Sequence, residues 1–135
     1  MARTNFEKLE VYQLAEKLSD EVWKIVLPWD NFAKFTVGRQ LVSAADSVGA
    51  NIAEGAGRGS FKENQRFVRI ARGSLQETQH WLRRTYRRKL LTEGEVSLLK
   101  PLVDELGPRL NAYLRSIGRG PGQRATDNGQ RTKSC

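Results

Sequence analysis

Arginine side chains recur on one side of a single segment of this sequence. Between Ser60 and Leu91 the chain has nine basic residues and only two acidic ones, Glu63 and Glu77. At 100° per residue of α-helix, seven arginines of this segment fall within about 160° of the helix surface. They are Arg66, Arg69, Arg72, Arg83, Arg84, Arg87 and Arg88. A guanidinium surface of one sign attracts polyanions, so these residues are candidates for binding the phosphates of a nucleic acid.

Two aromatic residues, Trp81 and Tyr86, flank this arginine face. Either could stack on a nucleobase or pack in a protein core, and we expect Tyr86 to pack in the core. The arginine face itself has a simpler alternative, which is a solvated surface without a specific partner.

Candidates for catalysis and metal binding are few. The only histidine is His80, and the only cysteine, Cys135, is the last residue and cannot form an internal disulfide. Glu77 and His80 have the Glu-x-x-His spacing of di-iron bundles, but such a site needs two of these motifs and two more glutamates, all pointing inward. Both residues fall on the basic, outward side of the predicted helix. We therefore expect no metal, no cofactor and no enzymatic activity.

The glycine-rich segment GAGRGS, from Gly55 to Ser60, precedes the arginine-bearing helix. Phosphate-binding glycine loops follow a strand, whereas this one follows a helical pattern, so we expect a tight hairpin with Gly55 capping the preceding helix in a left-handed conformation. The alternative is an anion site, because free N–H groups at the helix start could act together with Arg58, Ser60 and Lys62.

Two further groups of residues suggest contacts with other molecules. A polar stripe at helical spacing is either a solvated face or a protein–protein seam, and it consists of Gln40, Ser43, Ser47, Asn51 and Glu54. The aromatic residues are too numerous for the inner stripes of a small bundle, and they include Trp23, Trp29, Phe32, Phe35, Phe61 and Trp81. Because exposed aromatic patches mark interfaces, we expect a homo-oligomer.

The elements that position these residues follow from composition and periodicity. The chain has 135 residues, a net charge of +8, 39% hydrophobic and 28% charged residues, which is typical of one globular domain. It has no apolar run of about 18 residues and no signal-peptide pattern at its start, so we expect a cytoplasmic protein without a membrane span.

Four amphipathic patterns predict four helices, over residues 5–27, 35–54, 60–91 and 92–117. Capping-box spacing marks three of the starts, at Thr4, Ser60 and Thr92. Pro101 and Pro108 lie inside the fourth pattern, where we expect the helix to bend or break. The fold class is therefore all-α, an antiparallel up-down four-helix bundle over residues 1–118, with a long third helix. Residues 119–135 form a basic tail that lacks large aliphatic side chains, and we expect it to be disordered.

Three segments resemble a known family: FEKLEVYQLA, QLVSAADSVGANIAEGAGRGS and FVRIARGSLQET. They are similar to the proteins encoded in intervening sequences of bacterial 23S rRNA genes, over about residues 5–117. That family in turn resembles the accessory variability determinant proteins of diversity-generating retroelements. The resemblance implies a four-helix bundle, a pentameric ring with a basic surface, and binding to nucleic acid and a reverse transcriptase. It implies no catalytic residue.

We therefore expect a non-catalytic, oligomeric bundle that binds nucleic acid, above all structured RNA, through the seven arginines. The alternative is an interaction scaffold whose basic surface docks an acidic protein such as a polymerase or reverse transcriptase.

Overall fold

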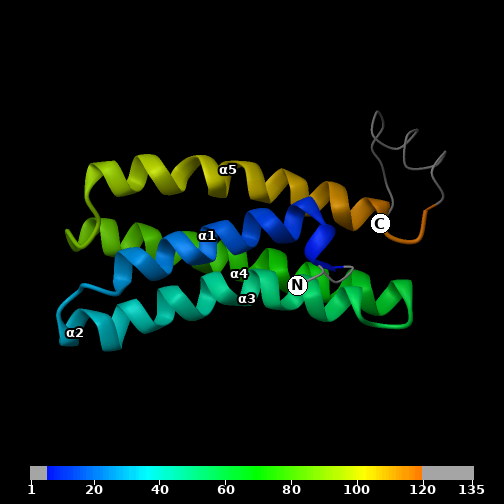
Figure 1. Ribbon diagram of the computed structural model, residues 1–135, viewed down its shortest axis with the longest axis horizontal. Coiled ribbons are helices and arrows are strands. Elements are labelled where there is room, and N and C mark those ends of the chain that lie inside the picture. The colour runs from blue at the N-terminus through cyan, green and yellow to red at the C-terminus, as the bar shows by residue number, and fades with distance from the viewer. Residues whose placement is uncertain (1–5, 120–135) are drawn as a thin grey trace.

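The computed structural model describes residues 6–119, and all regular structure in this range is helical (Figure 1). The elements are the 3₁₀ turn η1 (Phe6–Lys8), α1 (Glu10–Val26), α2 (Asn31–Ala33), the π-helical turn η2 (Lys34–Gly38), α3 (Arg39–Ala56), α4 (Phe61–Arg87) and α5 (Glu93–Ser116). Since α2, η2 and α3 follow one another without a gap, the chain forms four antiparallel rods. The predicted four-helix bundle is confirmed, and the predicted disordered tail lies outside the described residues apart from Arg119.

Each rod packs against two neighbours, in the order α1, α3, α4, α5 and back to α1. The apolar stripes at helical spacing are buried in the second and fourth rods, with Leu41, Ile52, Leu106 and Leu110 fully inaccessible to solvent. The stripes consist of Val37, Leu41, Ala44, Val48 and Ile52 in the second rod, and of Leu99, Val103, Leu106, Leu110, Leu114 and Ile117 in the fourth. Within residues 6–119 no helix has the length and apolar content of a membrane span.

The buried side of α4 contains two threonines besides its apolar residues. Thr78 and Thr85 are completely buried. The Thr78 hydroxyl donates to the Ser74 carbonyl at 2.8 Å, and the Thr85 hydroxyl donates to the Trp81 carbonyl at 2.9 Å. Both hydroxyls are thus satisfied within the helix, so the core accepts them without a partner from another element.

Side-chain caps fix where the long helices begin. The Ser60 Oγ accepts from the Glu63 N–H at 3.0 Å, and Thr92 and Glu95 form the reciprocal capping box that the sequence predicts. The second rod begins at Asn31 rather than near residue 35, because the Asp30 carboxylate caps it by accepting from the Ala33 N–H at 3.1 Å. Thr4, the predicted cap of the first helix, lies outside the described residues, and α1 begins at Glu10 after η1.

The expectation that Gly55 caps the second helix in a left-handed conformation is wrong. Helix α3 continues to Ala56, and Gly57 follows it with φ −85°. Gly55 is buried where α3 meets α4, and a Cβ there would lie 2.9 Å from the Phe67 Cβ and 3.1 Å from the Asn64 carbonyl oxygen. Glycine is required here by the close approach of two helices, not by a positive φ.

Helix α5 runs without a break through both of its prolines (Figure 1). Pro101 and Pro108 are seven residues apart and both are exposed. The carbonyls that lose their helical partners belong to Ser97 and Asp104, which are also exposed. Because water can satisfy these carbonyls, the prolines leave the helix continuous.

Candidate nucleic-acid interface

The structure divides the seven arginines of α4 into two groups. Arg66, Arg69 and Arg72 lie in the first half of the helix, and Arg83, Arg84, Arg87 and Arg88 lie at its C-terminal end. The 11 residue steps from Arg72 to Arg83 separate the groups by about 16 Å along the helix axis. We call the second group, together with Lys89, the C-terminal cluster.

The first group partly serves the bundle itself. Arg66 forms an ion pair with Glu63 at 3.2 Å, and its guanidinium lies 4.6 Å from the centre of the Phe67 ring. Arg72 is half-buried and donates to the Asn111 side chain at 3.0 Å, which joins α4 to α5. Within residues 6–119, only Arg69 of this group is exposed and has no side-chain hydrogen bond or ion pair. The group therefore offers less free charge than the sequence suggests.

The C-terminal cluster differs because its charge is not neutralised. Arg83, Arg87, Arg88 and Lys89 are exposed and Arg84 is half-buried. Within the described part of the chain, none of the five forms an ion pair with a carboxylate. The negative end of the α4 dipole offsets some of the mutual repulsion. Five adjacent cations without acidic partners make a local site of strong positive potential.

The backbone at the end of α4 holds this cluster in place. Lys89 has φ +64°, and the Leu90 and Lys89 N–H groups donate to the Thr85 and Tyr86 carbonyls at 2.9 and 3.0 Å. This is a Schellman motif, which usually has glycine at the left-handed position. A lysine there carries a conformational cost of about 1 kcal/mol, and it adds a cation to the cluster.

Of the two aromatic residues beside the cluster, Tyr86 was expected to pack in the core, and this expectation is wrong. Tyr86 is 43% exposed rather than packed in the core, and Trp81 is the half-buried one that packs against the core. The Tyr86 hydroxyl donates to Glu93 at 2.6 Å, and this hydrogen bond, followed by the Glu93 charge, raises the pKa of Tyr86. Tyr86 is therefore the ring that a ligand of the cluster can contact.

The residues of the possible anion site lie at the α3–α4 hairpin and are largely engaged. Arg58 pairs with Glu54 at 2.8 Å, Ser60 caps α4, and Lys62 is exposed. The first turn also contains Glu63, whose pKa is lowered chiefly by its hydrogen bond from Arg66. An ionised carboxylate already occupies the positive end of the helix dipole, so the C-terminal cluster is the stronger candidate for binding anions.

Glu77 and His80 are exposed on α4 between the two arginine groups. Glu77 accepts from the Trp81 indole N–H at 3.4 Å, and the His80 ring lies edge-on to the Trp81 ring. Among residues 6–119 no three histidine, cysteine or carboxylate side chains gather as a metal site would require.

Several aromatic side chains are exposed, as the sequence predicts. Trp23 is 55%, Phe32 81%, Phe35 57% and Phe61 67% exposed, whereas Trp29 and Trp81 pack against the core. Trp23, Leu27 and Phe35 line a shallow groove of about 250 Å³ near the α1–α2 connection. The polar stripe of α3 lies beside it, since Ser43 and Ser47 line a neighbouring groove that shares Val42 and Arg39.

The architecture is that of a four-helix bundle with one cationic helix end. The chain belongs to the 23S rRNA-intervening sequence protein family, whose sequence profile matches residues 7–112. A protein of unknown function from the S23 ribosomal protein family of Bacteroides thetaiotaomicron VPI-5482 has a similar crystal structure, with a TM-score of 0.69 and 19% sequence identity. The match covers 78% of this chain and 98% of that one, and it shows the shared fold. No curated protein matches the chain. The resemblance to retroelement accessory proteins stays a prediction.

Proposed function

We propose that this protein is a non-catalytic, oligomeric RNA-binding bundle of the cytoplasm that holds the phosphate backbone with the C-terminal cluster of α4. The observation that carries the proposal is the group of five cations at the end of α4 that lack acidic partners among the described residues. The family name refers to sequences that intervene in 23S rRNA, which makes structured RNA the first polyanion to test.

Recognition by such a cluster is electrostatic and depends little on sequence. Phosphate contacts position a nucleic acid but carry no base information. Arg69 and Arg66 can extend the contact along α4 where a longer RNA follows the helix, whereas Arg72 contributes less because it is bonded to Asn111. The same cations would also serve the alternative function, which is docking of an acidic protein such as a polymerase or reverse transcriptase.

Self-association is supported by the exposed aromatic side chains near the α1–α2 connection. The number five rests on the family resemblance alone. Light scattering in moderate salt should give a mass several times the 15.3 kDa of one chain. A monomer at micromolar concentration would contradict this part of the proposal.

Cross-linking tests the RNA proposal by position. An RNA hairpin with 4-thiouridine in its loop is irradiated with the protein, and the linked peptides are identified by mass spectrometry. We expect links at the C-terminal end of α4, between residues 79 and 89. Links confined to α1 or α3, or no links in low salt, would show that RNA does not use this cluster.

A further inference from the structure

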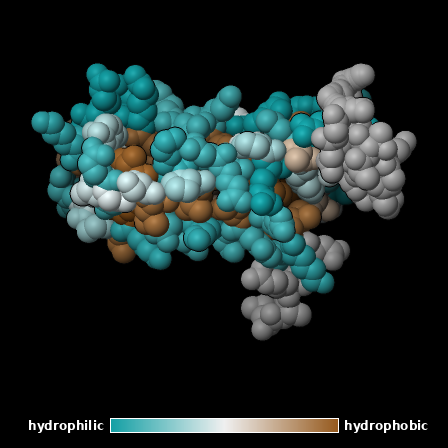
Figure 2. Space-filling view, turned by 90° about the horizontal axis from the view of Figure 1, so that it is seen from above, coloured by the Kyte–Doolittle hydropathy of each residue, from teal (hydrophilic) through white to brown (hydrophobic). Residues whose placement is uncertain are grey.

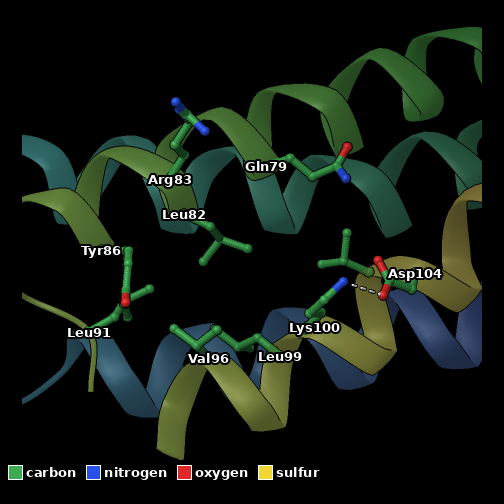
Figure 3. A pocket seen from close by; sticks show the side chains of 10 residues that line it. Gln79, Leu82, Arg83, Tyr86, Leu91, Val96, Leu99, Lys100 and Asp104 are labelled. Atoms are coloured by element: carbon green, nitrogen blue, oxygen red, sulfur yellow. Dashed lines mark hydrogen bonds and ion pairs between the residues drawn. The ribbon is translucent and has the colours of Figure 1, made fainter. Parts of the chain in front are cut away.

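An apolar groove lies between α4 and α5, near the connection that joins them (Figure 3). Its volume is about 460 Å³, and its floor consists of Leu82, Leu91, Val96, Leu99 and Val103. In Figure 3, Leu82 from α4 and Val96 and Leu99 from α5 point toward one another across the groove. The groove borders the C-terminal cluster of α4, because Arg83 is one of its lining residues. The Arg83 side chain points away from the apolar floor (Figure 3).

The floor is not fully covered by the chain itself. Leu82 and Val96 are only half-buried. Viewed from the α5 side, hydrophobic surface is visible in several places along the length of the bundle, between hydrophilic side chains (Figure 2). Removing such surface from water is favourable, so a ligand with aliphatic side chains gains free energy by filling the groove.

The two banks of the groove differ in charge. On the α4 bank, Arg83 has no ion pair among the described residues, and Arg87 lies one turn further along. On the α5 bank, Lys100 is neutralised by Asp104 at 2.8 Å. The Glu93 carboxylate lies near the end of the groove and accepts from Tyr86. A complementary ligand therefore presents negative charge to α4 and little negative charge to α5.

We infer that this groove binds an acidic amphipathic helix of a partner protein. Aliphatic side chains three and four residues apart would lie in the floor, and carboxylates on the flank of the same helix would face Arg83 and Arg87. Electrostatic complementarity of this kind selects the partner and its orientation.

The other occupants fit less well. Nucleobases stack on aromatic rings, but the floor is aliphatic with only Tyr86 at its edge. A second copy of the chain is assigned instead to the exposed aromatic residues near the α1–α2 connection. The inference specifies the partner of the alternative function, docking of an acidic protein, and it does not depend on RNA binding, so either proposal can fail while the other holds.

The test uses two matched variants of the full chain. Val96→Asp places a carboxylate in the floor, and Leu98→Asp places one on the same helix at a residue that is 48% exposed and does not line the groove. Circular dichroism serves to check that both variants fold. A displayed library of peptides of ~16 residues, about 24 Å of helix, is selected on the wild type, and the dissociation constants of recovered peptides are measured by fluorescence anisotropy.

We expect recovered peptides to carry leucine or isoleucine at helical spacing and a net negative charge. Val96→Asp and Arg83→Glu should each lower the affinity for the recovered peptides at least about tenfold. The matched variants Leu98→Asp and Arg69→Glu should leave this affinity unchanged. Failure to recover any peptide that discriminates Val96→Asp from Leu98→Asp would overturn the inference. It would also be overturned if Val96→Asp changes only the binding of a single-stranded RNA, or only the oligomer mass.

Discussion

Gly55 and Gly73 are two helical glycines with opposite surroundings, and they allow a direct test of how α3 packs on α4. A Cβ at Gly73 meets no atom within 4 Å, whereas a Cβ at Gly55 lies 2.6 Å from the Asn64 Oδ1 and 2.9 Å from the Phe67 Cβ. Alanine at an exposed helix interior stabilises by about 0.5–1 kcal/mol relative to glycine. We therefore expect Gly73→Ala to raise the free energy of unfolding by that amount.

Gly55→Ala gains the same helix propensity but loses more to steric overlap. The Asn64 amide can rotate away, but the Phe67 Cβ and the Asn64 carbonyl oxygen are fixed to the α4 backbone. Overpacking of this kind costs about 1–3 kcal/mol. The net loss should be at most about 2.5 kcal/mol, and the two alanine variants should differ by the overpacking cost itself, about 1–3 kcal/mol.

Urea unfolding followed by circular dichroism measures both variants at one protein concentration, because oligomerisation makes stability depend on concentration. Adding Asn64→Ala to Gly55→Ala should recover only part of the loss, since the two backbone-fixed contacts remain. Equal stability of Gly55→Ala and Gly73→Ala, or full recovery in the double variant, would refute the close approach of α3 and α4 at this point.

Three further predictions concern single residues of α4 and its end. Lys89→Gly should raise the free energy of unfolding by about 0.5–1 kcal/mol, because φ is +64° at this position and glycine adopts such a conformation without strain. A loss of stability on urea unfolding would show that the Schellman motif is not formed. Thr78→Val should change the free energy of unfolding by less than about 1 kcal/mol, because the buried hydroxyl is hydrogen-bonded only within its own helix. Thr78→Ala should be clearly less stable. A large loss of stability in the valine variant would reveal a partner of the hydroxyl outside α4. The Tyr86 phenol, assigned by difference from Tyr86→Phe at 295 nm, should titrate above its ordinary value of 10.0 and fall toward it in Glu93→Gln. Because folding raises the pKa of the Tyr86 phenol, the stabilisation from the Tyr86–Glu93 pair is fully present below the pKa that this phenol has in the unfolded chain. It is lost as pH rises through the pKa of the phenol in the folded protein. A phenol that titrates at its ordinary pKa would exclude the hydrogen bond.

Periodicity and caps were enough to predict the bundle. The apolar stripes at helical spacing in the second and fourth patterns are buried, from Val37 to Ile52 and from Leu99 to Ile117. The capping box at Thr92 forms as its spacing indicates. At Ser60 only the serine half of the box forms, because the Glu63 carboxylate accepts from Arg66 instead. Sequence alone did not identify Thr78 and Thr85 as core residues, although both follow Ala71 at seven-residue intervals on the buried side of α4. This seven-residue spacing could have indicated that both threonines lie on the buried side of the helix.

The errors came from positions where a neighbouring helix decides the outcome. A glycine near a helix end is explained equally well by a left-handed cap or by close packing, and only the position of α4 shows that Gly55 serves packing. Tyr86 falls on the apolar side of α4 by angle, yet it is exposed at the end of the helix. The groove beside it depends on the separation of α4 and α5, which no pattern within one helix encodes.

The salt dependence of RNA binding tests the central proposal most directly. Association constants for a labelled RNA hairpin are measured by anisotropy from about 50 to 300 mM salt, a range over which phosphate contacts weaken strongly. The test protein has Arg83, Arg84, Arg87 and Arg88 replaced by glutamine. The control removes four charges elsewhere, with Lys8, Lys17, Lys24 and Arg39 replaced by glutamine; all four are exposed.

With four or five phosphate contacts per subunit, the wild type should give a slope of log K against log salt of about −3 to −4. The cluster variant should keep its fold and flatten this slope by several units across unrelated RNA sequences, while the control should change it little. If the wild type does not bind at about 50 mM salt, or if the cluster variant keeps the wild-type slope, the C-terminal cluster of α4 is not an RNA-binding site.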